Sequence, residues 1–345
     1  MTVASTNGDG GSGWAIDDAV HRLREWGGER IFELPAPPVD DWIVGSAPEC
    51  ALQLHDPSGR VSRRHAQLVR QGAVWTLRDL ESRNGIRQDG ERRGSFQLAP
   101  GVEIELGGIR LVAESTRLLA LRALLGRLIG WAPERAAEVD RALTGVRWMA
   151  TQRAALILCG DGELVRTARR VHAHALGVEV PCVVATATTA LSELTPEQPG
   201  TLVLVVDELP RCITDLARAL RIPGARQRVI VLARQPSDAS AVAALLGPTC
   251  PVSVPAIAAR RSELERMIAE YAGDATVALG ARAPGFREHE HRWLGALELA
   301  THDEIEDVTY RLVALRNWGV TAGAAKLGIS HVALSRWAQR RRIPT

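Results

Sequence analysis

Lysine is almost absent from this sequence, in which Lys326 is the only lysine among 42 basic residues. A Walker-type nucleotide site needs a lysine to contact the outer phosphates, directly after a glycine-rich turn. The one candidate turn, Gly160-Asp161-Gly162, follows the apolar run "LILC" but is followed by Glu163. No ATP hydrolysis is therefore expected, and no cofactor is assigned.

Long apolar runs and paired cysteines are also missing. No stretch of 18 apolar residues occurs, so no transmembrane helix is expected. The cysteines show no C-x-x-C pair and no metal-ligand spacing, which predicts reduced thiols, no metal site and a cytoplasmic location. They are Cys50, Cys159, Cys182, Cys212 and Cys250.

The length and the ends of the chain suggest several parts. The sequence has 345 residues, of which 46% are hydrophobic, enough for two or three domains with real cores. The small, polar start "MTVASTNGDGGSG" predicts a disordered tail, which we extend over residues 1–27. The net charge is only +2, yet four arginines lie in the last ten residues.

Between residues 28 and 115 the pattern is that of an all-β domain. Short runs such as "DWIV", "AQLVR", "AVWTL" and "VEIEL" are separated by turn sequences such as "DPSG" and "QDGERRG". Closely spaced short strands predict a β-sandwich. Two polar stretches, "SGRVSRRHA" and "LESRNGI", interrupt the pattern.

Taken together, these two stretches resemble the forkhead-associated (FHA) domain, which binds phosphothreonine peptides. The resemblance implies that Ser62 holds the phosphate, Arg63 adds charge, His65 braces the loop and Asn84 holds the peptide backbone. A phosphate monoester carries about −1.5 to −2 charges and three acceptor oxygens, which such groups can meet. The phosphopeptide-binding residues expected from the resemblance are Gly45, Ser46, Ser62, Arg63, His65, Asn84 and Gly85.

One position departs from the FHA pattern. The family often has an arginine directly after the first glycine as a phosphate ligand, and here that position is Ser46. Two interpretations stay open. Arg63 or Arg64 compensates for the missing charge, or the domain binds its partner independently of phosphate.

Residues 116–272 alternate buried strands and helices, which predicts a parallel sheet covered on both faces. In order, these elements resemble the AAA+ domain of the sigma-54-dependent transcription activators. The Walker lysine and hydroxyl, the sigma-contacting loop and the sensor asparagine have no counterpart, and Arg234 occupies the sensor position. Asp207 and Glu208 stand in the acidic Walker B positions, where we expect a strand end without Mg²⁺. His172 and His174, two apart on a helix, do not share a face for a metal.

The C-terminal sequence contains clear signals for the starts and ends of helices. A linker or helix is expected at residues 273–301. Residues 302–345 predict a long helix from His302 to Asn317, a short helix over "TAGAAKLG" with Thr321 at its start, and a third helix after a turn at Gly328. This part resembles the Fis-type helix-turn-helix that ends the same activator family. Leu334 and Trp337 are expected to face the core. The DNA-binding residues expected from the resemblance are His331, Val332, Ser335 and Arg336 at bases, and Arg340, Arg341 and Arg342 at phosphates.

The sequence thus predicts a multidomain chain: an FHA β-sandwich, a degenerate α/β AAA+-like domain and an all-α helix-turn-helix. The leading hypothesis is a non-enzymatic, phosphothreonine-responsive transcription regulator that binds DNA as a homodimer. Its other partner would be a phosphorylated protein such as a Ser/Thr kinase or its substrate. Two alternatives stay open: an ATP-using sigma-54-dependent activator, or a phosphopeptide adaptor whose helix-turn-helix docks protein.

Overall fold

The computed structural model describes residues 14–36, 41–152, 154–162, 164–193, 197–221, 225–282, 286 and 288–343. It separates into two compact units, described one at a time below. The first comprises the described parts of residues 1–158 and 167–252, and the second those of 159–166 and 253–345. No helix in the described part of the chain is both long and apolar enough to cross a bilayer.

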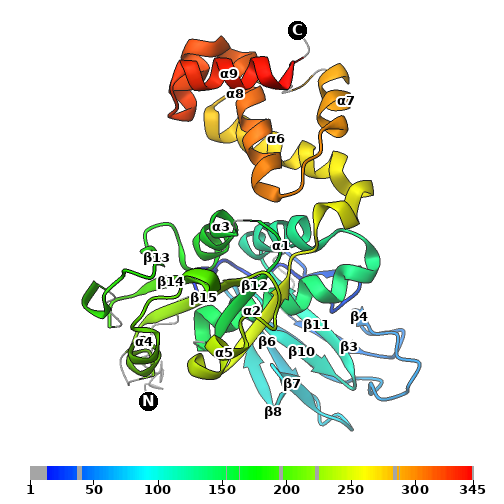
Figure 1. Cartoon of the computed structure of the whole chain (residues 1–345). Helices are drawn as coiled ribbons and strands as arrows, with labels where there is room; N and C mark the ends of the chain where they lie inside the picture. Colours follow the sequence, from blue (N-terminus) through cyan, green and yellow to red (C-terminus); the bar gives the residue numbers. More distant parts are fainter. Residues whose placement is uncertain are drawn as a thin grey trace. The chain divides into compact units, whose positions relative to one another are not determined.

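The first unit begins with a sandwich of two sheets (Figure 1). One sheet has the order β2-β1-β11-β10-β7-β8 and the other β4-β3-β5-β6-β9. Strands of the first sheet are β1 Arg22–Glu25, β2 Ile31–Glu33, β7 Ile86–Gln88, β8 Glu91–Arg93, β10 Glu103–Leu106 and β11 Ile109–Glu114. Strands of the second are β3 Asp41–Gly45, β4 Leu52–Gln53, β5 Ala66–Gln71, β6 Val74–Asp79 and β9 Ser95–Gln97.

Alternating side chains from the two sheets fill the core between them. In β10, Ile104 and Leu106 are buried while the two glutamates of the strand are partly exposed. In β6, Trp75 and Leu77 are buried in the same way, and they belong to one apolar cluster with Ile104. This period of two is what a sheet with one core-facing side requires. The predicted β-sandwich is therefore confirmed.

The predicted disordered tail over residues 1–27 is wrong where the structure describes it. Strand β1 lies inside the first sheet and pairs antiparallel with both β2 and β11. Ile16 and Val20, which precede it, are buried. The strand has a charged residue on each side of Leu23, so its sequence lacks the apolar density that marks other strands. Residues 1–13 lie outside the described residues.

Buried charges join this sandwich to the helices that follow it. Arg24 of β1 is 1% exposed. Its guanidinium donates to Glu114 Oε1 at 2.7 Å and to Asp140 Oδ2 at 3.0 Å, and Asp140 lies in α2. Burial opposes its charge, yet the hydrogen bonds and charges of these two carboxylates raise the pKa of Arg24. Arg147 of α2 adds a second link, with its Nη1 2.7 Å from Asp89 Oδ1.

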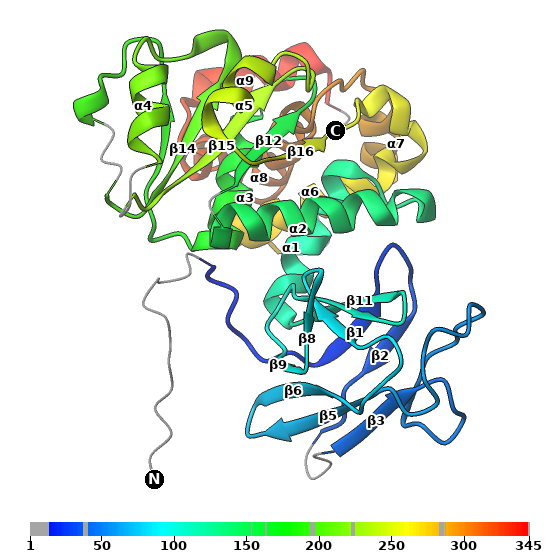
Figure 2. The same ribbon diagram turned by 90° about the horizontal axis from the view of Figure 1, so that it is seen from below.

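An α/β region completes the first unit. Its sheet has the order β13-β14-β15-β12-β16, and β13, β14 and β15 run parallel. Figure 2 shows α1 and α2 between the sandwich and this sheet. Its strands are β12 Ala155–Cys159, β13 Cys182–Ala185, β14 Gly200–Val205, β15 Gln227–Ala233 and β16 Thr249–Ser253. Its helices are α1 Thr116–Ile129, η1 Pro133–Arg135, α2 Ala136–Gln152, α3 Val165–Leu176, η2 Leu191–Glu193, η3 Val206–Glu208, α4 Ile213–Ala219 and α5 Ser240–Leu246.

The burial of this sheet matches the sequence prediction. All seven residues of β15 and the first five of β14 are buried, as expected for strands covered on both faces. A mixed α/β region with a parallel sheet is therefore confirmed. Its relationship to AAA+ domains stays a prediction.

The second unit is helical. Its helices are η4 Ile257–Glu263, α6 Leu264–Leu279, α7 Glu288–Ala296, α8 His302–Leu327 and α9 His331–Arg341. Ala275 and Leu279 of α6 pack on Val313 and Ala314 of α8. The predicted boundary at residue 272 is wrong, because it falls inside α6 and the unit already includes Ser253.

Capping residues set the ends of the last two helices. A capping box at Thr301 and Glu304 starts α8, and Gly328 in the left-handed conformation ends it. Non-helical backbone at Gly319 (φ 70°, ψ −169°) divides α8 into two helices, between the predicted end at Asn317 and the predicted start at Thr321. The Ser330 hydroxyl accepts from the N–H of Ala333 at 3.1 Å and starts α9. The turn at Gly328 and the helix that Ser330 begins are where the sequence predicts them.

Candidate functional site

Two loops of the sandwich, β3–β4 and β4–β5, touch each other because a glycine allows a close approach of their backbones. A Cβ atom on Gly45, at the end of β3, would lie 2.2 Å from the carbonyl oxygen of Arg63. Only glycine fits such an approach. Beyond it, the N–H of Ser46 donates to the carbonyl of Ser62 at 3.1 Å, and the N–H of Ala47 to that of Arg63 at 3.1 Å. The β3–β4 loop is thereby fixed to the β4–β5 loop.

A buried imidazole joins the β4–β5 loop to the β6–β7 loop. His65 is fully buried. Its Nδ1 accepts the backbone N–H of Ser62 at 3.0 Å, so the neutral ring carries its proton on Nε2. Nε2 then donates to the carbonyl oxygen of Gly85 at 3.0 Å. His65 thus positions both loops and is itself out of reach of a ligand.

The hydroxyl of Ser62 lies at the junction of these loops. Its Oγ accepts the backbone N–H of Arg83 at 3.1 Å. An oxygen that accepts in this way still has its own hydrogen to donate. Ser62 is half-buried, so this hydrogen can reach a ligand from solvent.

Asn84 and Gly85 form the rim of the β6–β7 loop. Gly85 has a φ of +73°, and a Cβ there would lie 2.7 Å from Arg92 Nε. Asn84 is exposed, and its Nδ2 donates to the carbonyl of Arg60 at 2.7 Å. The side-chain oxygen of Asn84 and one N–H of its amide remain available for an extended peptide.

Two bracing residues were missed in the sequence. Asp56 accepts the N–H of Val61 at 2.6 Å and that of Ser58 at 2.9 Å, and the Ser58 hydroxyl is the main cause that lowers the pKa of Asp56. Ser82 Oγ accepts the N–H of Gly85 at 3.0 Å. The "DPSG" turn could have indicated Asp56, because aspartate often accepts from the backbone two residues on. Nothing in the local sequence indicates Ser82.

Arginines surround the loops. Arg63 lies 3.3 Å from Glu49 Oε1, yet its side chain is 83% exposed. Glu49 keeps its negative charge readily, because its own backbone N–H and then Arg63 lower its pKa. Within the described residues, the exposed side chains of Arg64 and Arg83 form no hydrogen bond or ion pair. Three cations therefore stand close to the Ser62 hydroxyl in sequence and on the joined loops.

Ser46, which stands in the place of the family's arginine, stabilises the loop. Its hydroxyl donates to the carbonyl of Val61 at 3.1 Å, so it braces the backbone before Ser62. Beside it lies a hollow of about 520 Å³. Arg30 lines this hollow and donates to the carbonyl of Gln53 at 3.1 Å. A cation is therefore present near Ser46, although it comes from a different loop.

Comparison with known proteins bears directly on these loops. The family model of the FHA domain matches residues 42–107, which contain the three loops that meet at Ser62. The chain contains an FHA domain. Over 69 residues, or 20% of the chain, it is 39% identical to the oxoglutarate dehydrogenase inhibitor of Corynebacterium diphtheriae. The chain spans about half the length of that curated relative, 47%.

Solved structures of FHA domains are also similar to this chain. One, from a structural and functional analysis of phosphothreonine-dependent FHA domain interactions, is 29% identical with a TM-score of 0.25. It covers 27% of this chain and 94% of its own. Mycobacterium tuberculosis EmbR, solved with a low-affinity phosphopeptide, is 27% identical with a TM-score of 0.25 and covers 28% of this chain and 26% of its own.

The expected DNA-binding residues share the last helix and its end. Leu334 and Trp337 are buried, as predicted, and the guanidinium of Arg311 in α8 lies 5.5 Å from the centroid of the Trp337 ring. Arg342 ends α9 in the left-handed conformation, with φ 47°. Ser335 and Arg341 are half-buried, and the exposed members are His331, Val332, Arg336, Arg340 and Arg342. Contact of this surface with DNA stays a prediction.

The glycine turn after β12 is filled by its own chain. A Cβ on Gly160 would lie 2.8 Å from the carbonyl oxygen of Val254, and one on Gly162 would lie 2.7 Å from Thr301 Cγ2. Arg166, a residue that could replace the missing lysine charge, instead donates to Asp307 at 2.7 Å. Glu163 lies outside the described residues. The turn has no open cradle for phosphates at these two glycines.

Two predicted polar groups of the α/β region, His172 and Asp207, have structural partners. His172 lies between Thr201 Oγ1 and the carbonyl oxygen of Val180, both at 2.8 Å, and burial lowers its pKa. Asp207 is exposed and lies 3.7 Å from the guanidinium of Arg234. No group of three metal-binding side chains occurs in the part of the chain that the structure describes.

Proposed function

We propose that this chain is a phosphothreonine-dependent adaptor whose FHA domain holds a phosphorylated partner protein in the cytoplasm. The main observation behind this proposal is the Ser62 hydroxyl. It accepts a hydrogen bond from the backbone N–H of Arg83 and keeps its own hydrogen for a ligand. All five cysteines are free thiols, which supports a reducing compartment.

Each loop residue has a role in this binding. Ser62 donates to a phosphate oxygen, and Arg63, with Arg64 beside it, supplies positive charge for charge-assisted hydrogen bonds. Asn84 contacts the backbone of the peptide. Gly45, Ser46, His65 and Gly85 act through the loop geometry and do not touch the ligand.

The relatives support a role in binding. The FHA family match lies on the loops, and the curated relative is named as an inhibitor of an enzyme, a role that fits a protein acting by docking. A Ser/Thr kinase or a substrate of such a kinase is the partner class that this chemistry recognises. The rest of the chain then presents or regulates the docked protein.

The α/β region serves this function as a scaffold without catalysis. The filled turn at Gly160 and Gly162 and the ion pair of Arg166 with Asp307 support this view. Asp207, which would hold Mg²⁺ in an active relative, lies on the surface beside Arg234.

A second candidate function is DNA binding by the C-terminal helix pair. The observation that favours it is the set of exposed residues at the start of α9, next to a turn capped by Ser330 and Gly328. A recognition helix presents its N-terminal residues to base edges, and a homodimer would double the short site. The chain would then be a phosphothreonine-responsive transcription regulator.

A titration with a phosphothreonine peptide library and its unphosphorylated twin tests the adaptor. We expect binding only to phosphorylated peptides, with at least tenfold weaker binding in Ser62→Ala because one charge-assisted hydrogen bond contributes about 1.5–3 kcal/mol. Ser95→Ala is the matched control, since Ser95 is exposed on β9 of the same domain. Equal affinity for both libraries contradicts the proposal.

Measurement of DNA binding at several salt concentrations decides the second candidate. Contact with DNA predicts an affinity that falls steeply with salt, with Arg341→Ala reducing the salt slope and Arg336→Ala affecting some sequences more than others. A C-terminal pair that docks protein predicts no salt-dependent DNA binding and no difference between the two variants.

A further inference from the structure

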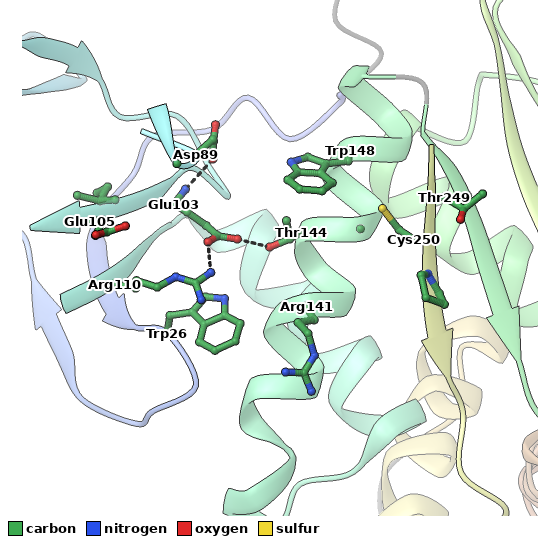
Figure 3. Close-up of a pocket in the computed structure, with 14 residues that line it drawn as sticks. Trp26, Asp89, Glu103, Glu105, Arg110, Arg141, Thr144, Trp148, Thr249 and Cys250 are labelled. Atoms are coloured by element: carbon green, nitrogen blue, oxygen red, sulfur yellow. Dashed lines mark hydrogen bonds and ion pairs between the residues drawn. The ribbon is translucent and has the colours of Figure 1, made fainter. Parts of the chain in front are cut away.

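A pocket of about 930 Å³ lies within the first unit, away from the phosphopeptide loops. Figure 3 shows it between the sandwich, helix α2 and strand β16. Asp89 and Gly90 line it and follow β7, whereas Asn84 and Gly85 precede that strand. The three residues of β7 separate the two places by about 10 Å. The pocket is therefore distinct from the FHA ligand site.

One face of α2 forms a wall of this pocket. Arg141, Thr144, Gly145 and Trp148 line it and are spaced at i, i+3, i+4 and i+7, which is one side of a helix. Gly145 lets the helix approach β16, because a Cβ there would lie 3.0 Å from the Cβ of Cys250. The sequence thus builds a wall with an arginine at one end and an indole at the other.

Two indole rings line the pocket from different elements. Trp148 is 36% exposed, which is unusual for so large an apolar side chain. Trp26, from the turn after β1, has the guanidinium of Arg110 over its ring at 3.9 Å. Its indole Nε1 is buried and has no hydrogen-bond partner among the described residues. Flat aromatic walls of this kind favour a planar apolar ligand.

The acidic groups of the pocket are already neutralised. Asp89 is held by Arg147, at 2.7 Å. Glu103 accepts the hydroxyl of Thr144 at 2.6 Å and forms an ion pair with Arg110. The third carboxylate of the pocket, Glu105, lies 4.0 Å from Arg87. These pairs leave little demand for a cationic ligand.

Arg141 is different, because it lines the pocket without a partner. Within the described residues its guanidinium forms no hydrogen bond and no ion pair. Cys250, across the pocket, adds no negative charge, since burial raises the pKa of its thiol. The unpaired charge of the pocket is therefore positive and lies at the end opposite Trp148 along α2.

From this arrangement we infer that the pocket binds a small aromatic anion. Its rings lie against the indoles of Trp148 and Trp26, and its anionic group pairs with Arg141. This site is separate from the phosphothreonine site, so either proposal can fail without the other.

Fluorescence titration of the full chain with two probes tests the inference. The first probe, 1-anilinonaphthalene-8-sulfonate, has aromatic rings and a sulfonate, and the second, N-phenyl-1-naphthylamine, has the same rings without the charge. We expect one saturable site for each probe. Arg141→Gln weakens the sulfonate probe at least tenfold and the neutral probe less than twofold, whereas Trp148→Ala weakens both.

Control variants identify the site. Arg169→Gln removes an exposed arginine of α3 outside the pocket, and Val178→Ala removes a side chain that is 78% exposed, so neither changes binding. Ser62→Ala separates the pocket from the phosphopeptide loops and also leaves both probes unchanged. Trp148→Leu keeps an apolar side chain and provides a second variant if Trp148→Ala does not fold.

Three results overturn the inference. They are the absence of saturable binding, unchanged binding of both probes in Arg141→Gln and the Trp148 variants, and an equal loss of both probes in Arg141→Gln. The last would show that the arginine shapes the pocket and does not pair with the anion.

Discussion

The Nε2 atom of His65 lies 3.0 Å from the carbonyl oxygen of Gly85, and this bond joins the two loops that carry Ser62 and Asn84. The loops are thus held before any ligand arrives. A site that is ordered in advance loses less conformational entropy on binding, which increases affinity.

Replacement of His65 by alanine tests this bracing role. We expect His65→Ala to leave a buried amide and a carbonyl without partners, lowering the free energy of unfolding by about 1–3 kcal/mol. Phosphopeptide affinity should fall by about tenfold, as measured by calorimetry on the folded His65→Ala variant. His331→Ala, an exposed histidine of α9, should change neither quantity. Unchanged affinity in folded His65→Ala would mean that the loops keep their geometry without it.

Ser46 offers a gain-of-function test. There is room for a longer side chain at this position, because Ser46 is half-buried. Its hydroxyl donates one hydrogen bond, to the carbonyl of Val61. Ser46→Arg should tighten phosphopeptide binding by about tenfold, equivalent to about 1.4 kcal/mol. The matched variant Ser46→Ala loses the same hydroxyl bond without adding charge and should not tighten it. If the two variants bind alike, this position does not face the phosphate.

The buried pair of Arg24 and Asp140 should be essential for stability. Asp140→Asn leaves the Arg24 guanidinium buried with less compensating charge, and loss of one partner of a buried pair costs about 3–5 kcal/mol. Chemical denaturation of the full chain measures this loss. Asp215→Asn, in an exposed pair with Arg218, should cost less than about 1 kcal/mol. Similar costs for the two substitutions would contradict the role assigned to Arg24.

Phosphate release by the purified protein tests the scaffold interpretation of the α/β region. We expect no ATP turnover, with or without DNA and phosphopeptide, because Gly162 packs on Thr301 and Arg166 is paired with Asp307. Phosphoryl transfer depends on positioning and charge stabilisation, which these contacts do not provide. Turnover that disappears in Asp207→Ala would show instead that this region is an active ATPase.

Local signals in the sequence predicted the features that local interactions determine. The strand pattern around Trp75 and Leu77 shows the sandwich because one face of each strand is buried. Ser330 and Gly328 mark the helix ends because caps involve residues three or four apart. Ser62 and Asn84 were predicted as ligand-binding residues from the spacing of a known family, and their contact with a ligand stays a prediction.

Features that depend on partners far apart in the sequence could not be predicted from local patterns. Strand β1 was missed because Arg24 is neutralised by Asp140, 116 positions along the chain, and no local pattern shows this. The boundary inside α6 was missed because Ala275 and Leu279 pack on α8, which the sequence of α6 does not reveal. Ser82 and the pocket at Trp148 also depend on contacts between separate elements.

The most direct test of the central claim is the ratio of two dissociation constants. One phosphothreonine peptide from the library and its unphosphorylated twin are titrated into the full chain at one salt concentration. Two charge-assisted hydrogen bonds, from Ser62 and Arg63, contribute about 3 kcal/mol together, which predicts binding at least about 100-fold tighter for the phosphopeptide. A ratio near one would contradict phosphothreonine recognition by this FHA domain.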